Sequence, residues 1–176
     1  KILLRGAKLD KIRSLTGMPD LYDNGDMNNM PSKLFEIERR IKNIFINFSF
    51  QEIRTPILED ANLFKRSVGS SSDIVNKEIY SFNDRNDKII AMRPEGTASV
   101  IRSIVEKKLD HSTHKLWYMG PMWRYERPQK GRYRQFNQAG IEILGVQEGL
   151  PEFEMISVVC SIIQEFEIKN CLIKIN

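Results

Sequence analysis

Several features that would narrow the class of protein are scarce or missing in this 176-residue sequence. Cysteine occurs only at Cys160 and Cys171, which argues against a disulfide-rich scaffold. Two free thiols in a reducing compartment are the simplest interpretation, and a disulfide between them is the alternative. No run of about 18 apolar residues is present, so no membrane span is expected. The start, Lys1 to Asp10, has neither a methionine nor the apolar centre of a signal peptide, so we expect a processed chain or part of a longer one.

The net charge and the composition exclude few classes of protein. The formal net charge is +4, which is compatible with a polyanionic partner and too small to demonstrate one. With 41% hydrophobic and 28% charged residues, the composition is that of an ordinary globular protein. The length is that of one domain, long enough to bury a sizeable core without cross-links.

The apolar spacing predicts helices and short strands without a regular βαβ order. Apolar residues at helical spacing predict helices at 31–48, 97–109 and 151–167. Alternating or β-branched runs predict strands at 51–58, 78–83, 88–92, 115–126, 134–145 and 172–176. Pro56 interrupts the first of these and favours an edge strand, while 20–31 and 67–72 have the composition of loops. The mixture favours an α+β fold with a largely antiparallel sheet.

The segment from Leu116 to Gly145 contains the most chemically specific pattern. Since side chains alternate between the faces of a strand, pairing of the two strands would bring four side chains onto one floor: Arg124, Phe136, Gln138 and Glu142. An arginine suits a phosphate, an aromatic ring suits a base, and a carboxylate suits an ammonium or imidazole N–H. We expect Gly140 to leave a gap for the ligand. The alternative is a salt-bridged amphipathic sheet that faces solvent.

The second informative segment is Met92–Thr97, with the sequence MRPEGT. Pro94 fixes the chain, Gly96 permits a tight turn, and Thr97 is placed to cap the following helix. Taken alone, the segment is equally consistent with an ordinary strand-to-helix turn in which Glu95 lies near the positive end of the helix.

Together these segments closely resemble the histidyl-tRNA synthetase family. The stretch LWYMGPMWRYERPQKGRYRQFNQAGIEILG resembles the strand–loop–strand "motif 2" of class II synthetases, at about 115–145. The predicted helix 31–48 with FQEIRTPILED resembles "motif 1", at about 31–60, and LFKRSVGSSSDIVNKEIYSF also follows the family. The resemblance covers about residues 14–176, leaving residues 1–13 without a match, and long contiguous matches are far more specific than short patterns. It implies a class II synthetase-like, mostly antiparallel sheet flanked by helices.

The resemblance also implies an activity and roles for particular residues. It implies a cytoplasmic histidine–tRNA ligase that uses ATP with Mg²⁺, L-histidine and tRNA(His). It implies no membrane association, and it assigns no residue of this chain as a metal ligand. Arg124 would be the catalytic arginine on the ATP α-phosphate, Glu126 and Phe136 would contact adenine, and Arg132 would contact the terminal phosphates. Glu95, Thr97 and Gln138 would hold the histidine α-amino group, and Glu142 would read the imidazole. The motif 1 helix would form a homodimer interface.

The sequence also departs from the family pattern. Asn137 stands where the family often has histidine, and Thr16 precedes Gly17 where the family commonly has arginine. Motif 3, the histidine-specific motifs of the RGLDYY and GGRYD type and the anticodon-binding domain are not in residues 1–176. We therefore expect the N-terminal portion of a truncated catalytic domain, not fully active alone.

Two alternatives from other functional classes stay open. One is the regulatory subunit of ATP phosphoribosyltransferase, a non-catalytic relative that senses histidine. The other is a degenerate module that binds only RNA or a partner. Function has to be argued from the site rather than the shared fold, and retention of Glu95, Thr97 and Arg124 favours the enzyme.

Overall fold

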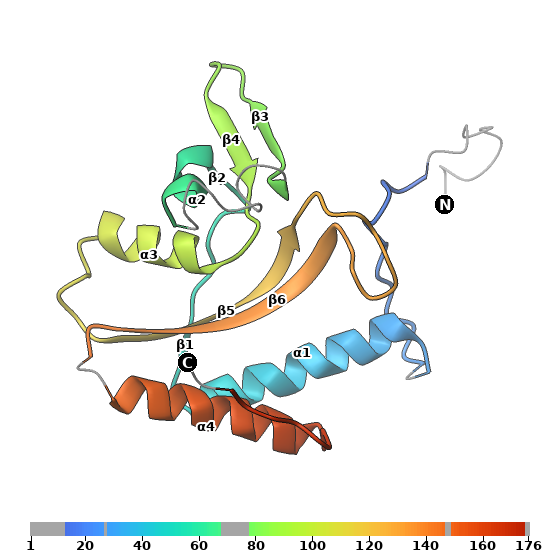
Figure 1. The fold of residues 1–176 in the computed structure, drawn as a ribbon, viewed down its shortest axis with the longest axis vertical. Helices are drawn as coiled ribbons and strands as arrows, with labels where there is room; N and C mark the ends of the chain where they lie inside the picture. The colour runs from blue at the N-terminus through green and yellow to red at the C-terminus, as the bar shows by residue number, and fades with distance from the viewer. Residues whose placement is uncertain (1–12, 27, 68–77, 147–148, 175–176) are drawn as a thin grey trace.

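The structure, a computed structural model, describes residues 13–26, 28–67, 78–146 and 149–174. Helices and strands mix without βαβ alternation and form two three-stranded sheets (Figure 1). The elements in chain order are α1 (Met30–Asn47), β1 (Gln51–Glu52), β2 (Leu58–Asp60), α2 (Ala61–Ser67), β3 (Ser81–Asn83), β4 (Ile89–Met92), α3 (Thr97–Glu106), β5 (His114–Trp123), β6 (Gln135–Leu144) and α4 (Leu150–Glu165). The predicted α+β class and three predicted helices are confirmed.

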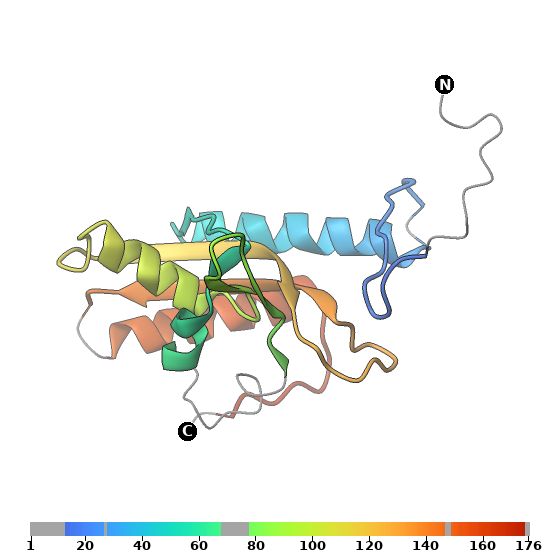
Figure 2. The same cartoon turned by 90° about the horizontal axis from the view of Figure 1, so that it is seen from above.

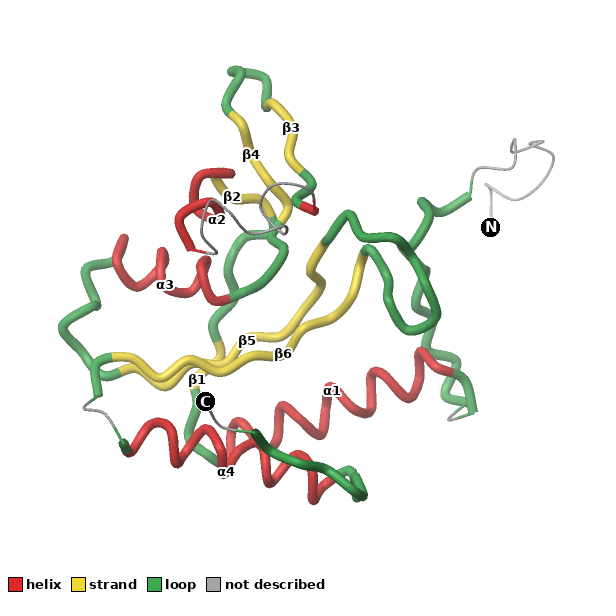
Figure 3. Tube along the Cα trace, viewed as in Figure 1, coloured by secondary structure: helices red, strands yellow, loops and turns green. Residues whose placement is uncertain are grey.

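The larger sheet has the order β1-β5-β6 and is dominated by the long β5–β6 hairpin, which Figure 3 shows as two yellow segments of tube running side by side. β5 and β6 are antiparallel through ten residue pairs, with Tyr118 opposite Gly140 and Met122 opposite Phe136. β1 pairs in parallel with β5 only at Leu116 and Trp117. The rest of the outer edge of β5 therefore has no strand beside it among the described residues.

Alternation along β5 and β6 separates two apolar layers. On one face, Trp117 packs with Phe45 of α1 and Val158 of α4. On the other face, Tyr118 and Met122 pack with Val100 and Ile104 of α3, together with Phe136. The two long helices thus cover one face of the sheet and α3 covers part of the other, as Figures 1 and 2 show from perpendicular directions. The uncovered part of the α3 face carries the predicted floor.

The smaller sheet has the order β2-β4-β3 and is antiparallel throughout. It packs with α2 and α3 around Phe64, whose side chain is completely buried, and Ala91. The predicted hairpin of 78–83 and 88–92 is confirmed, with shorter strands. The strand β4 leads directly into the MRPEGT turn, so the smaller sheet carries one side of the floor.

Three expectations about the elements were wrong. The segment 51–58 is not one strand: β1 and β2 lie at the edges of different sheets, because the chain crosses from one to the other around Pro56. The helix α2 was missed because seven residues are too few to show a period, and it includes Ser67, which was assigned to a loop. No strand forms at 172–174, and residues 68–72 and 175–176 of those predictions lie outside the described residues. Among the described residues, no helix is long and apolar enough to cross a membrane.

Candidate functional site

The β5–β6 register brings the predicted floor residues onto one face. Phe136, Gln138 and Glu142 lie opposite Met122, Gly120 and Leu116, so these three side chains lie along the face that α3 leaves partly open. Arg124 directly follows β5, and its N–H donates to the carbonyl of Arg134 at 2.9 Å, which continues the hairpin past the last strand residue. The opposite face is core, since Ile141 and Ile143 pack with α1 and α4.

Arg124 is held by one nitrogen and leaves two free. Its Nε donates to the carbonyl of Pro94 at 2.9 Å, and its Cζ lies 5.1 Å from the centroid of the Phe136 ring. Among the described residues, neither terminal nitrogen has a hydrogen-bond or ion-pair partner. A guanidinium anchored in this way presents a planar fork of donors that suits a phosphate or carboxylate.

The loop between β5 and β6 is fixed by its own charged residues. Arg132 forms an ion pair with Glu126, whose side chain is mostly buried. Arg134 Nε donates to the Glu126 carbonyl at 3.0 Å, and the Arg134 guanidinium lies 4.0 Å from the centroid of the Tyr125 ring. A bridge between Gln129 and Arg132 closes the tip of the loop. Glu126 and Arg132 therefore lie together at the Arg124 end of the floor.

At the other end, the MRPEGT turn meets β6 through a short hydrogen bond. Thr97 Oγ1 donates to Glu142 Oε1 at 2.7 Å. Burial raises the pKa of the Glu142 carboxyl, the charge of Glu95 raises it further, and the bond from Thr97 acts in the opposite direction. Two carboxylates thus lie close enough to repel each other, an arrangement that a bound cation would relieve.

The turn does not cap its helix as expected. Thr97 is the first residue of α3, and the preceding Gly96 makes no capping bond with a side chain. Instead, the Ala98 N–H donates to the carboxylate of Glu95, at 3.1 Å to Oε1. The structural role weighed for Glu95, near the positive helix end, is therefore realised, and the Thr97 hydroxyl is left for Glu142. Between the two ends of the floor, the buried Gln138 Oε1 has no hydrogen-bond partner among the described residues.

The expected gap at Gly140 is already filled, which corrects the prediction from sequence. A Cβ built on Gly140 would lie 2.8 Å from Cε1 of Tyr118, and nearer still to its Cζ and hydroxyl oxygen. A Cβ on Gly96 would lie 2.7 Å from Cδ2 of the same ring. The two glycines therefore admit the Tyr118 side chain rather than a ligand. No role for Tyr118 was predicted from the sequence; it lies opposite Gly140 in the β5–β6 register.

Arg93 is a second residue whose role was missed. Its backbone N–H donates to Ile57 and its carbonyl accepts from Trp123, both at 3.0 Å. Its guanidinium donates to the Pro121 carbonyl at 3.1 Å and the Thr55 carbonyl at 3.0 Å. With a relative exposure of only 8%, Arg93, the second residue of the MRPEGT segment, joins the two sheets. Burial lowers its pKa, although the charge of Glu59 opposes this.

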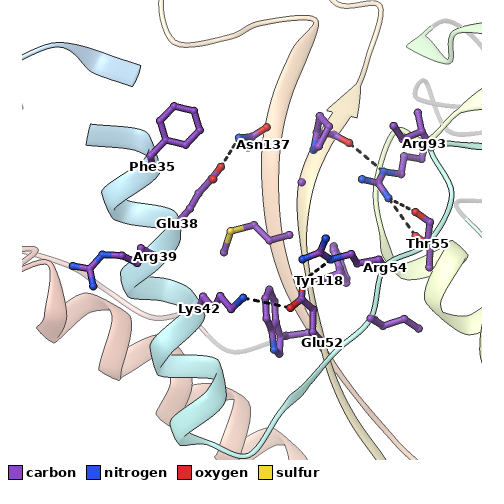
Figure 4. A pocket seen from close by; sticks show the side chains of 16 residues that line it. Phe35, Glu38, Arg39, Lys42, Glu52, Arg54, Thr55, Arg93, Tyr118 and Asn137 are labelled. Carbon is purple, nitrogen blue, oxygen red and sulfur yellow. Dashed lines mark hydrogen bonds and ion pairs between the residues drawn. The ribbon is translucent and has the colours of Figure 1, made fainter. Parts of the chain in front are cut away.

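A hollow of about 640 Å³ is lined by Arg93 together with residues of α1, β1 and β5. Figure 4 shows Glu38, Arg39 and Lys42 of α1 on one wall and Arg54 and Thr55 on the other. Asn137 donates to Glu38 across it, and Lys42 pairs with Glu52 at 3.5 Å. Asn137, which stands where the family often has histidine, thus lies on the α1 face of the sheet. Among the described residues, no three His, Cys, Asp or Glu side chains are grouped so that they could hold a metal ion.

A long helix, a proline-bearing crossover and an antiparallel strand–loop–strand floor together define a class II aminoacyl-tRNA synthetase fold. A solved apo histidyl-tRNA synthetase of S. aureus superimposes with a TM-score of 0.71 at 35% identity, over 90% of this chain and 35% of that one. The family described as histidyl-tRNA synthetase matches residues 29–176. The chain belongs to the histidyl-tRNA synthetase family.

The sequence relatives agree with this assignment. The chloroplastic histidine–tRNA ligase of Gracilaria tenuistipitata var. liui is 50% identical over 129 residues, which cover 73% of this chain and 31% of that protein. The histidine–tRNA ligase of Legionella pneumophila (strain Lens) is 47% identical over 151 residues, or 85% and 34% of the two chains. The chain thus spans about a third of the length of these relatives. A Bacillus halodurans C structure titled as an ATP phosphoribosyltransferase regulatory subunit/histidyl-tRNA synthetase shares the fold, with a TM-score of 0.73 at 19% identity, over 94% of this chain and 40% of that one.

Proposed function

We propose that residues 1–176 are the N-terminal part of the catalytic domain of a cytoplasmic histidine–tRNA ligase, with motif 1 at about 31–60 and motif 2 at about 115–145. One observation carries the proposal. A tethered arginine with a free donor fork lies at one end of a sheet face, and a hydroxyl-bound carboxylate lies at the other end. Such a face suits a substrate pair that combines a phosphate with a small molecule carrying an amine and a ring N–H.

ATP would occupy the Arg124 end. The free terminal nitrogens of Arg124 would bind the α-phosphate, since a guanidinium fork matches two phosphate oxygens. Phe136 would stack on adenine, Glu126 would contact the adenine side, and Arg132 would exchange part of its ion pair with Glu126 for the terminal phosphates. Mg²⁺ would arrive with ATP as part of the substrate and neutralise charge on its phosphates.

Histidine would occupy the Glu142 end. The unpaired oxygen of Gln138 supports an ammonium nearby, because a buried acceptor without a donor costs about 1–3 kcal/mol. Glu95 would attract the same ammonium and Thr97 would contact it. Glu142 would accept the imidazole N–H, which an apolar pocket could not satisfy. The mutual repulsion of Glu95 and Glu142 makes a cationic or donor-rich ligand favourable between them.

The proposed reaction needs no side-chain nucleophile. The histidine carboxylate would attack the α-phosphorus of ATP, forming histidyl-adenylate and releasing pyrophosphate; the terminal ribose hydroxyl of tRNA(His) would then displace AMP. Catalysis would rest on placing two anions together and stabilising the charge that develops. Arg124 lies where it could do both, because Pro94 holds its Nε while neither terminal nitrogen has a partner among the described residues.

The test is histidine-dependent ATP–pyrophosphate exchange by the full-length protein, with each substrate varied in turn. Arg124→Ala should reduce exchange at least about a hundredfold, roughly 3 kcal/mol at the transition state, without unfolding the protein. Glu142→Gln should weaken histidine use far more than ATP use. Arg85→Ala, in the exposed β3–β4 turn, is the control and should match the parent.

Three results would count against the proposal. Absence of histidine-dependent exchange by the parent would favour the regulatory or RNA-binding alternative. Exchange by Arg124→Ala within about fivefold of the parent would remove Arg124 from the phosphate site. Equal losses of histidine and ATP use in Glu142→Gln would make Glu142 a scaffold residue rather than the reader of the imidazole.

We also propose that the full-length protein is a homodimer through motif 1. The hollow beside α1 is bordered by Met119 and Gly120 of β5, and two partly exposed apolar side chains, Phe35 and Ile57, line it. Exposed apolar side chains around a concave surface are a common feature of protein–protein contacts. A two-fold contact would let α1 and the 50–58 segment of each protomer cover the hollow of the other.

A further inference from the structure

A tight turn at residues 15–18 precedes the motif 1 helix. The N–H of Met18 donates to the carbonyl of Leu15 at 2.9 Å, and Gly17, the third residue of the turn, has a φ of +77°. This backbone conformation favours glycine, because glycine has no Cβ. Leu15 is 69% exposed, and among the described residues only Gly17 joins the segment 13–20 to the rest of the chain by hydrogen bonds. The turn is therefore attached at a single residue.

The attachment point is the base of the β5–β6 loop. The Gly17 carbonyl accepts from the N–H of Arg134 at 2.8 Å and from the N–H of Gln135 at 3.0 Å. Gln135 is the first residue of β6, and its side chain accepts from Nε1 of Trp123 at 3.1 Å. A Cβ built on Gly17 would lie 3.0 Å from Cγ of Arg134 and 3.1 Å from its backbone nitrogen. The turn thus fixes the point at which the loop returns to the sheet.

Arg134 connects this turn with the loop and with the floor. Its carbonyl accepts from the N–H of Arg124 at 2.9 Å. Its Nε donates to the Glu126 carbonyl at 3.0 Å, and its guanidinium lies 4.0 Å from the centroid of the Tyr125 ring. The Glu126 side chain in turn forms the ion pair with Arg132. One residue bound to the turn therefore contacts three consecutive residues at the end of the floor where ATP would bind.

We propose that Gly17 is a positioning residue for ATP: its carbonyl holds Arg134, and Arg134 holds the loop that carries Glu126 and Arg132. This inference rests on the proposed ATP site. Glu126 and Arg132 would contact different parts of one nucleotide, so a shift of the loop backbone by about 1 Å would misplace both, and shifts of that size can cost about a hundredfold in rate. Glu142, at the other end of the floor, has no hydrogen bond to the turn among the described residues.

The test is Gly17→Ala in the full-length protein, with Gly25→Ala as the matched control. Gly25 has a φ of +76° and no atom within 4 Å of a Cβ built on it, so alanine there meets the same backbone strain without the collision. In pyrophosphate exchange, Gly17→Ala should raise the KM for ATP about fivefold or more and leave the KM for histidine within about twofold of the parent. Gly25→Ala should leave both values within about twofold.

Limited trypsin digestion without nucleotide gives a readout that needs no activity. Lys130 and Arg132 are exposed in the loop, and both are cleavage sites for trypsin. Cleavage requires the loop backbone to open locally. Its rate should therefore be several times higher in Gly17→Ala than in Gly25→Ala, because only the first substitution disturbs the residue that holds the loop.

A double-mutant cycle tests whether Gly17 acts through Arg134. Arg134→Met keeps the apolar stem, removes the donor to the Glu126 carbonyl and should also raise the KM for ATP. Adding Gly17→Ala to it should cause little further rise.

Three results would overturn the positioning role: a Gly17→Ala protein that matches Gly25→Ala in either the KM for ATP or the trypsin rate, equal rises of the two KM values, or full additivity in the cycle. Absence of histidine-dependent exchange in the parent would refute the proposed function instead. In that case the trypsin comparison still tests whether the turn holds the loop, so the two failures are distinguishable.

Discussion

The Tyr118 ring occupies the volume that any side chain at Gly140 would need. These residues lie directly opposite each other in the β5–β6 register, and a Cβ on Gly140 would lie 2.8 Å from Tyr118 Cε1. Glycine at this position therefore serves the packing of a neighbouring strand and not a bound molecule.

Gly140→Ala should destabilise the full-length protein by about 1–3 kcal/mol, because the added methyl group forces the buried Tyr118 ring out of its position. Urea-induced unfolding measures the effect. The control is the same substitution in a Tyr118→Leu background, where the smaller side chain leaves room and the cost of the methyl group should largely disappear. Equal costs in both backgrounds would refute the packing argument.

The stability of the protein should depend on pH through Glu142. Burial raises its folded-state pKa above the ordinary value of 4.5, so its contribution to stability is fully present below 4.5 and is lost as pH rises through the folded pKa. Glu142→Gln should therefore have a higher Tm than the parent at neutral pH, with the gap closing on acidification towards pH 4.5. Thermal unfolding across this range, with the exposed Asp20→Asn as control, measures it. If the difference in Tm between Glu142→Gln and the parent widens on acidification, the pKa of Glu142 is lowered by the fold rather than raised.

Arg93→Met should cost about 3 kcal/mol or more in free energy of unfolding. The substitution keeps the apolar stem and leaves the carbonyls of Thr55 and Pro121 without their buried donor. Chemical denaturation of the full-length protein measures the loss. Arg85→Met, in an exposed turn, should change the stability little. A loss below about 1 kcal/mol for Arg93→Met would mean that the sheets are joined mainly by other contacts.

Ile57→Glu should weaken the proposed homodimer. Ile57 lines the hollow beside α1 and is 45% exposed, so a charge there would be buried only in an assembled interface. Light scattering coupled to gel filtration measures the mass of the full-length protein. Ile89→Glu is a matched control, because Ile89 is 50% exposed on the β3–β4 hairpin. A parent protein that is monomeric, or equal dissociation by both variants, would refute this interface.

Periodicity predicted the long elements and the floor well. Ten-residue strands and helices of ten or more residues repeat their patterns several times, and the period of two assigned Phe136, Gln138 and Glu142 to one face. Periodicity could not predict the short elements. β1 and β2 have two and three residues, and their separation into different sheets depends on a tertiary crossover that local pattern does not encode.

The contacts that complete the site were also hidden from sequence. A glycine marks missing volume but does not say what fills it, so Gly140 was assigned to a ligand when Tyr118 fills the space. In the sequence, Arg93 looks like any charged residue at the end of a strand. Its role is visible only in its hydrogen bonds to four residues: Thr55, Ile57, Pro121 and Trp123. Long-range packing of this kind depends on which elements meet.

The MRPEGT turn borders both the hollow beside α1 and the floor. Arg93 borders the hollow beside α1, while Glu95 and Thr97, two and four residues later, border the floor. Pro94 between them holds Arg124 through its carbonyl. Arg93, which contacts Thr55 and Pro121, and Thr97, which contacts Glu142, are therefore separated by only three residues of backbone, one of which also holds Arg124.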